Sequence, residues 1–137
     1  MIGIVIVTHG RLGDALIDVA DSILGQRPEG IVSISINIKE NVDNLRAKIV
    51  EGIKKVNRND GVLILTDMFG GTPSNLSYSF LEEGYLEVIS GVNLPVLIKA
   101  VNTRKKMGIS ELALNIETFG KKSISLASGI LKGRKRG

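Results

Sequence analysis

The sequence opens with IGIVIVTHG, residues 2–10, in which an unbroken run of apolar and small residues leads into Thr8 and His9. Such a run is typical of a β-strand covered on both faces. Residues 62–65 (VLIL) repeat the pattern and lead into Thr66 and Asp67. Residues 32–38 instead alternate Val or Ile with Ser or Asn, which indicates a strand with one face in water. The first and third strands therefore belong inside a sheet and the second at its edge.

Helical patterns separate these strands. Apolar residues at helical spacing predict helices over residues 12–23, 42–56 and 110–119. Start signals, Pro73 after Thr72 and the segment 93–95 (NLP), predict two more over residues 73–83 and 94–105. Asn41 and Thr72 are the expected N-caps of the second and third helices, and Gly25 and Gly84 the expected stops of the first and third. Further strands are predicted over residues 86–89 and 123–126. The alternation predicts an α/β fold with a doubly wound, mainly parallel sheet.

A strand order of 2-1-3-4 satisfies the burial of each strand and places the chain reversal between the first and third strands. Sheets of this kind open a crevice at the carboxyl ends of those strands. The only histidine, His9, ends the first strand, and Asp67 follows the third. Since neighbouring strands lie about 4.8 Å apart, the Asp67 carboxylate is expected to reach a ring nitrogen of His9.

These residue types together suit phosphate chemistry. A neutral imidazole is a nucleophile near pH 7, and a carboxylate on one ring nitrogen fixes the tautomer and stabilises positive charge. Gly70 and Gly71 let backbone N–H groups approach an anion, and Thr72 and Ser74 add hydroxyl donors at a helix start. Taken singly, a lone histidine can be a packing residue, the glycines a helix start and Asp67 a turn former. Together they predict a nucleophilic histidine beside a binding site for a tetrahedral dianion. We expect no metal and no cofactor.

Composition narrows the class of protein. The 137 residues fit one domain, and the absence of cysteine excludes disulfides and thiolate sites, which fits the cytoplasm. No apolar run reaches the roughly 18 residues of a membrane span, and without a signal peptide the mature protein is expected to start near Met1. Four of the 18 basic residues lie in the last six positions, which leaves a neutral body and argues against nucleic acid. We expect a domain over residues 1–131 and a solvated basic tail over 132–137.

At these residues the chain resembles the IIA domain of the mannose/fructose/sorbose family of the sugar phosphotransferase system. The resemblance covers essentially the whole chain. It rests on three segments in the same order and spacing: residues 3–10 (GIVIVTHG), 61–75 (GVLILTDMFGGTPSN) and 88–95 (VISGVNLP).

The resemblance implies that His9 is phosphorylated on Nε2 by the phosphohistidine form of the phosphocarrier HPr and passes the phosphate to a IIB component. Asp67 matches the aspartate beside the active histidine, and Arg11 is a further candidate phosphate contact, or a solvated residue of the first helical turn. The family also implies a homodimer in which an antiparallel C-terminal strand, here residues 123–126, is exchanged. Contact with the membrane components IIC and IID would be indirect, at the inner membrane. Since the chain ends after the IIA unit, we expect a separate acceptor protein.

Other functions share parts of this pattern. A regulatory phosphoacceptor of an incomplete phosphotransferase system would use the same site, as would the phosphotransfer subunit of a dihydroxyacetone kinase, although the opening loop of that subunit differs. A histidine phosphatase needs an arginine before its histidine and a second histidine, whereas this chain has Thr8 and one histidine. No glycine-rich nucleotide-binding motif occurs.

Overall fold

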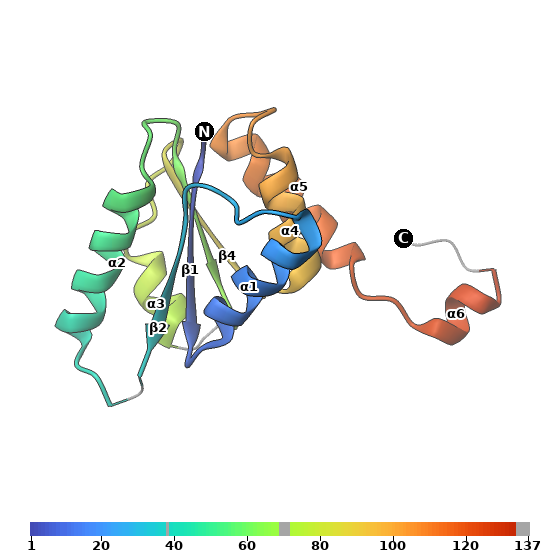
Figure 1. Ribbon diagram of the computed structural model, residues 1–137, viewed down its shortest axis with the longest axis horizontal. Helices are drawn as coiled ribbons and strands as arrows, with labels where there is room; N and C mark the ends of the chain where they lie inside the picture. The colour runs from blue at the N-terminus through green and yellow to red at the C-terminus, as the bar shows by residue number, and fades with distance from the viewer. Residues whose placement is uncertain (38, 69–71, 134–137) are drawn as a thin grey trace.

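Four parallel strands form the sheet of the computed structural model, which describes residues 1–37, 39–68 and 72–133, without the side chains of residues 72–74 (Figure 1). The strands are β1 (Gly3–His9), β2 (Ile31–Ile36), β3 (Val62–Thr66) and β4 (Leu86–Ser90). Their order is β2-β1-β3-β4, and every neighbouring pair is parallel. The predicted α/β class, strand order and edge position of the second strand are therefore confirmed.

Helices cover both faces of the sheet. Figure 1 shows α1 (Leu12–Leu24), α4 (Leu94–Thr103) and α5 (Ile109–Lys122) on one side, and α2 (Val42–Val56) and α3 (Thr72–Tyr78) on the other. Each side has its own apolar cluster, and alternate residues of β1 enter one or the other. Ile4 and Ile6 face α1, whereas Val5 and Val7 face α2. This two-sided burial explains the unbroken apolar run of β1.

Local signals set three helix ends where the sequence places them. The side chain of Asn41 accepts a hydrogen bond from the Asn44 N–H at 2.8 Å and caps α2. Asn93 caps α4 in the same way through the Val96 N–H. Gly25 ends α1 with a φ of 81°, a left-handed conformation that glycine adopts without strain.

The third helix ends earlier than predicted, at Tyr78 and not at Gly84. The Ser79 hydroxyl donates to the Leu76 carbonyl at 2.6 Å, and the N–H groups of Ser79 and Phe80 bond to carbonyls three residues back. These bonds replace the helical pattern with tight turns. The prediction was wrong because it took Gly84 as the stop, whereas the turns at Ser79 and Phe80 end the helix before that glycine.

The predicted strand over residues 123–126 does not form within the described single chain. Helix α5 continues to Lys122, and the Ser123 hydroxyl closes it by donating to the Gly120 carbonyl at 2.7 Å. Residues 124–126 form no regular secondary structure and lead into a short helix, α6 (Ala127–Leu131), which the sequence did not predict. We call residues 124–133 the C-terminal arm. A strand needs a neighbour, and the arm stands clear of the sheet of its own chain (Figure 1). Pairing with a second copy therefore stays a prediction.

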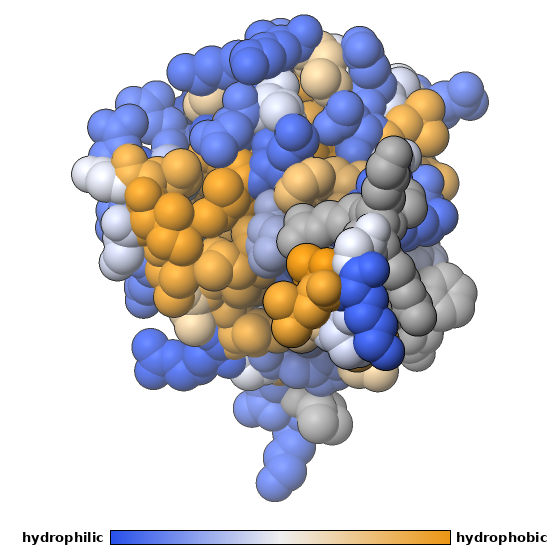
Figure 2. All heavy atoms as spheres, turned by 90° about the vertical axis from the view of Figure 1, so that its right-hand side faces the viewer, coloured by the Kyte–Doolittle hydropathy of each residue, from blue (hydrophilic) through white to orange (hydrophobic). Residues whose placement is uncertain are grey.

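The arm carries apolar side chains that its own chain does not cover. Ile124 is 83% exposed, Leu126 69% and Leu131 86%. Figure 2 shows further apolar side chains on the face from which the arm projects. Large exposed apolar residues include Val19 and Ile23 of α1. Among the described residues, no helix is long and apolar enough to cross a membrane.

Close packing between β1 and α2 depends on Gly3. A Cβ at this position would lie 2.5 Å from the Val56 carbonyl oxygen, a backbone atom that cannot rotate away. We expect Gly3→Ala to lower the free energy of unfolding by about 1–3 kcal/mol, as overpacked cores do. Gly108→Ser is the control, because a Cβ there meets no atom within 4 Å, and it should change stability by less than about 0.5 kcal/mol. Urea unfolding checks both, and equal losses in the two variants would contradict this account.

Candidate active site

The structure brings His9 and Asp67 together at the carboxyl ends of two neighbouring strands. His9 is the last residue of β1, and Asp67 follows β3, which pairs with β1 through Val7 and Thr66. The Asp67 Oδ2 atom lies 2.9 Å from the His9 ring Nδ1 and also accepts the His9 backbone N–H at 2.9 Å. One carboxylate oxygen therefore fixes both the backbone and the ring of the histidine.

The electrostatics of the pair determine the tautomer of the ring. Burial raises the pKa of the Asp67 carboxyl, but the hydrogen bonds from the His9 backbone and ring, together with the charge of the ring, outweigh it. The pKa is therefore lowered, and the ionised carboxylate can only accept. Nδ1 must then carry the hydrogen, which leaves the lone pair on Nε2 available for reaction.

The side chains of His9 and Asp67 differ in their exposure to solvent. The His9 side chain is 37% exposed and the Asp67 side chain 12%. The histidine can therefore meet a reactant from outside while its carboxylate partner stays shielded. The second Asp67 oxygen, Oδ1, is buried and has no hydrogen bond within the described part of the chain.

Thr8 ties the end of β1, next to His9, to the helix that follows, although the sequence pattern did not single it out. Its side chain is buried, and its hydroxyl accepts the Gly13 N–H at 2.9 Å near the start of α1. This bond takes the place of a cap from Arg11, whose side chain makes no capping bond. Gly10 adopts a φ of 53° and donates to the Ile36 carbonyl. The available signal was a polar residue ending an otherwise apolar buried strand.

The predicted phosphate contacts are described only in part. Gly70 and Gly71 lie outside the described residues. Thr72 and Ser74 belong to the backbone of α3, but their side chains are not among those described. Arg11 is exposed in the turn after His9. Their role in binding phosphate stays a prediction.

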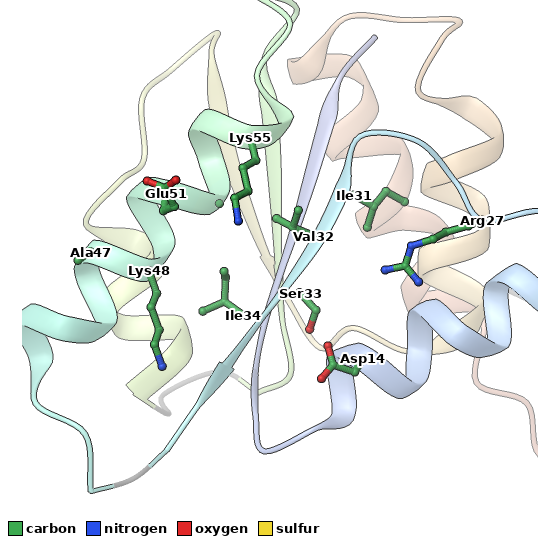
Figure 3. A pocket seen from close by; sticks show the side chains of 11 residues that line it. Asp14, Arg27, Ile31, Val32, Ser33, Ile34, Ala47, Lys48, Glu51 and Lys55 are labelled. Atoms are coloured by element: carbon green, nitrogen blue, oxygen red, sulfur yellow. The ribbon is translucent and has the colours of Figure 1, made fainter.

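A groove of about 600 Å³ lies elsewhere, along β2 between α1 and α2, and neither His9 nor Asp67 lines it. In Figure 3, Lys48, Glu51 and Lys55 of α2 stand on one side of β2, with Asp14 and Arg27 on the other. Charged side chains beside a free strand edge discourage the addition of another strand. This groove therefore has the features of a protected sheet edge.

Comparisons with known proteins identify the family of this chain. Residues 3–117 match the family model described as PTS system fructose IIA component. The chain is similar to a fructose-specific EIIA component of Bacillus subtilis, with 29% identity over 93% of this chain and 88% of the relative. It is 36% identical to part of a mannose-specific EIIAB component of Escherichia coli, over 75% of this chain and 32% of that protein.

A solved structure shows the same fold. The phosphotransferase system component EIIA from Streptococcus agalactiae superposes with a TM-score of 0.83 and 28% identity, over 93% of this chain and 98% of that one. Its agreement in fold extends over nearly the full length of both chains. On the family model, the sequence relatives and the fold, the chain belongs to the mannose/fructose family of IIA components of the sugar phosphotransferase system.

Proposed function

We propose that this protein is a cytoplasmic phosphoryl carrier that accepts phosphate on His9 Nε2 and passes it to a partner protein. The observation that carries this proposal is the 2.9 Å contact between His9 Nδ1 and Asp67 Oδ2. This contact supports Nε2 as the reacting atom, because Nδ1 is engaged by the carboxylate and the ring is partly exposed. Membership of the phosphotransferase family supports the same chemistry.

The proposed step is an in-line transfer between two nitrogen atoms. The Nε2 lone pair forms a bond to phosphorus while the N–P bond of the donor phosphohistidine breaks and returns its electron pair to the donor ring. The proton on Nδ1 stays in its hydrogen bond to Asp67, and the carboxylate stabilises the positive charge that develops on the ring. Positioning and charge stabilisation therefore supply the catalysis.

The donor in this proposal is the phosphohistidine form of HPr, and the acceptor is a IIB component. The name of the Escherichia coli relative joins an A and a B unit in one protein, which supports a B unit as the acceptor. We propose that residues 70–74 and Arg11 hold the phosphate oxygens. The sugar-translocating membrane components would then be reached only through the acceptor.

We further propose that the protein is a homodimer in which the C-terminal arm contacts the partner. Ile124 and Leu126 are too exposed to contribute to the core of their own chain. Their alternation with Ser123 and Ser125 suits a strand with one buried face. Pairing with the sheet of a second copy would cover these side chains.

His9→Ala should abolish labelling of the protein. Incubation with phosphoenolpyruvate, enzyme I and HPr should place an acid-labile phosphate on the wild type, because phosphohistidine breaks down in acid. The variant has no other histidine, so no label should remain. Mass spectrometry and a radiolabelled donor check both points. A label that persists in the variant would refute the assignment of His9.

Replacing Asp67 by Ala or Asn should slow transfer without unfolding the domain. Either change removes the charge that supports the ring, and we expect the rate to fall roughly 10²- to 10³-fold, as when one stabilising group is removed elsewhere. Because the pKa of Asp67 is lowered, the carboxylate is ionised throughout the range of about pH 6–8, so the charge that both variants lack is present in the wild type across that range. Quench-flow labelling at one fixed pH compares the rates, and variants that transfer phosphate as fast as the wild type would contradict this role of Asp67.

The protein should sediment as a dimer, and Ile124→Asp with Leu126→Asp should convert it to a monomer. Two charges would make burial of the arm against a partner unfavourable. Leu114→Asp is the matched control, because Leu114 is 68% exposed on α5 outside the arm. Analytical ultracentrifugation distinguishes the outcomes. A monomeric wild type, or a double variant that stays dimeric, would exclude the arm-mediated dimer.

A further inference from the structure

Three hydroxyl groups connect the carboxyl ends of β3 and β4 with α3. The Thr66 hydroxyl donates to the Ser90 Oγ atom at 2.9 Å, and the Tyr78 hydroxyl lies 2.9 Å from the same Ser90 atom. Thr66 and Ser90 are register partners in the sheet, and Tyr78 is the last residue of α3. We call these three residues the hydroxyl chain.

The hydroxyl chain ends next to the active site. Thr66 is fully buried and directly precedes Asp67, the residue that holds the His9 ring. The Thr66 carbonyl also accepts the N–H groups of Gly91 and Val92, at 2.9 and 2.8 Å. Both the side chain and the carbonyl of Thr66 are therefore tied to the end of β4. The peptide that leads into Asp67 is fixed from that side, as His9 fixes the carboxylate from the other.

Apolar side chains of α3 contribute little to holding this helix against the sheet. The helix has seven residues, and Leu76 is the one buried apolar residue among its described side chains. The bond from Tyr78 to Ser90 therefore contributes a directional link between α3 and the sheet. Hydrogen bonds define direction as well as distance, and linked hydroxyls strengthen one another.

We propose that Tyr78 is a positioning residue for phosphoryl transfer, which acts through Ser90 and Thr66 to hold Asp67 against the His9 ring. The inference rests on the proposed function of His9. Tyr78 does not touch the reacting atoms in this account. Loss of its hydroxyl leaves Ser90 with one partner fewer, loosens Thr66 and lets the carboxylate depart from its contact with Nδ1.

The test compares Tyr78→Phe with Tyr85→Phe. Tyr85 lies before β4, at the opposite end of that strand, and its hydroxyl makes no hydrogen bond in the described part of the chain. Tyr78→Phe should lower the initial rate of labelling by phospho-HPr roughly three- to tenfold, with the donor concentration for half-maximal rate unchanged. Tyr85→Phe should label as the wild type does. Ser90→Ala should also be labelled slowly, whereas Ser90→Thr should keep the wild-type labelling rate because it retains a hydroxyl.

A spectroscopic measurement on the unphosphorylated protein separates positioning from a purely structural role. The ¹⁵N signals of the His9 ring report which nitrogen carries the hydrogen. They should show one tautomer in the wild type and a mixture in Tyr78→Phe, at a temperature where both are folded. Ring signals and labelling rates identical to those of the wild type would overturn the inference. If the wild type takes up no label, the proposed function fails, and the ring signals alone still decide whether Tyr78 positions Asp67.

Discussion

A single carboxylate oxygen of Asp67 receives the backbone N–H and the ring of His9, across 58 residues of sequence. This contact sets requirements for the rest of the structure. The two residues must end adjacent parallel strands, and the carboxylate must be ionised although it is largely shielded from water. The strand order β2-β1-β3-β4 meets the first requirement. The two hydrogen bonds to one oxygen meet the second, because they lower the pKa of the carboxyl against the effect of burial.

Two buried threonines support this contact, one on each strand. Thr8 precedes His9 and Thr66 precedes Asp67, and both side chains are excluded from solvent. Each hydroxyl ties its strand to a different neighbour, Thr8 to the start of α1 through Gly13 and Thr66 to β4 through Ser90. His9 and Asp67 each follow a threonine that cannot shift without breaking a buried hydrogen bond. Breaking it leaves a buried polar group unsatisfied, and that costs more free energy than the bond contributes net to stability.

Periodicity in the sequence was enough to predict the sheet, its order and the meeting of His9 and Asp67, because burial on two faces leaves unbroken apolar runs in β1 and β3. The helix ends at Asn41 and Gly25 could be predicted equally well from local chemistry. The early end of α3 could not be predicted, since it depends on the Ser79 hydroxyl bonding to the backbone. The Thr66–Ser90 contact joins two separate strands, and the Thr8–Gly13 contact links a strand end to the helix that follows it; no spacing rule encodes either contact. The candidate phosphate contacts Gly70 and Gly71 lie outside the described residues.

Because of where the C-terminal arm lies, closure of the apolar interior and association with a second copy are separate processes, which many small oligomers combine. Neither apolar cluster contains a residue of the arm, so the sheet and its helices close their interior without it. The His9–Asp67 contact and its supporting threonines also come from one chain. The described contacts of the reactive pair are therefore complete within one chain. Any association through the arm would be second-order, and dilution would change the number of chains in a particle while leaving each histidine equipped to react.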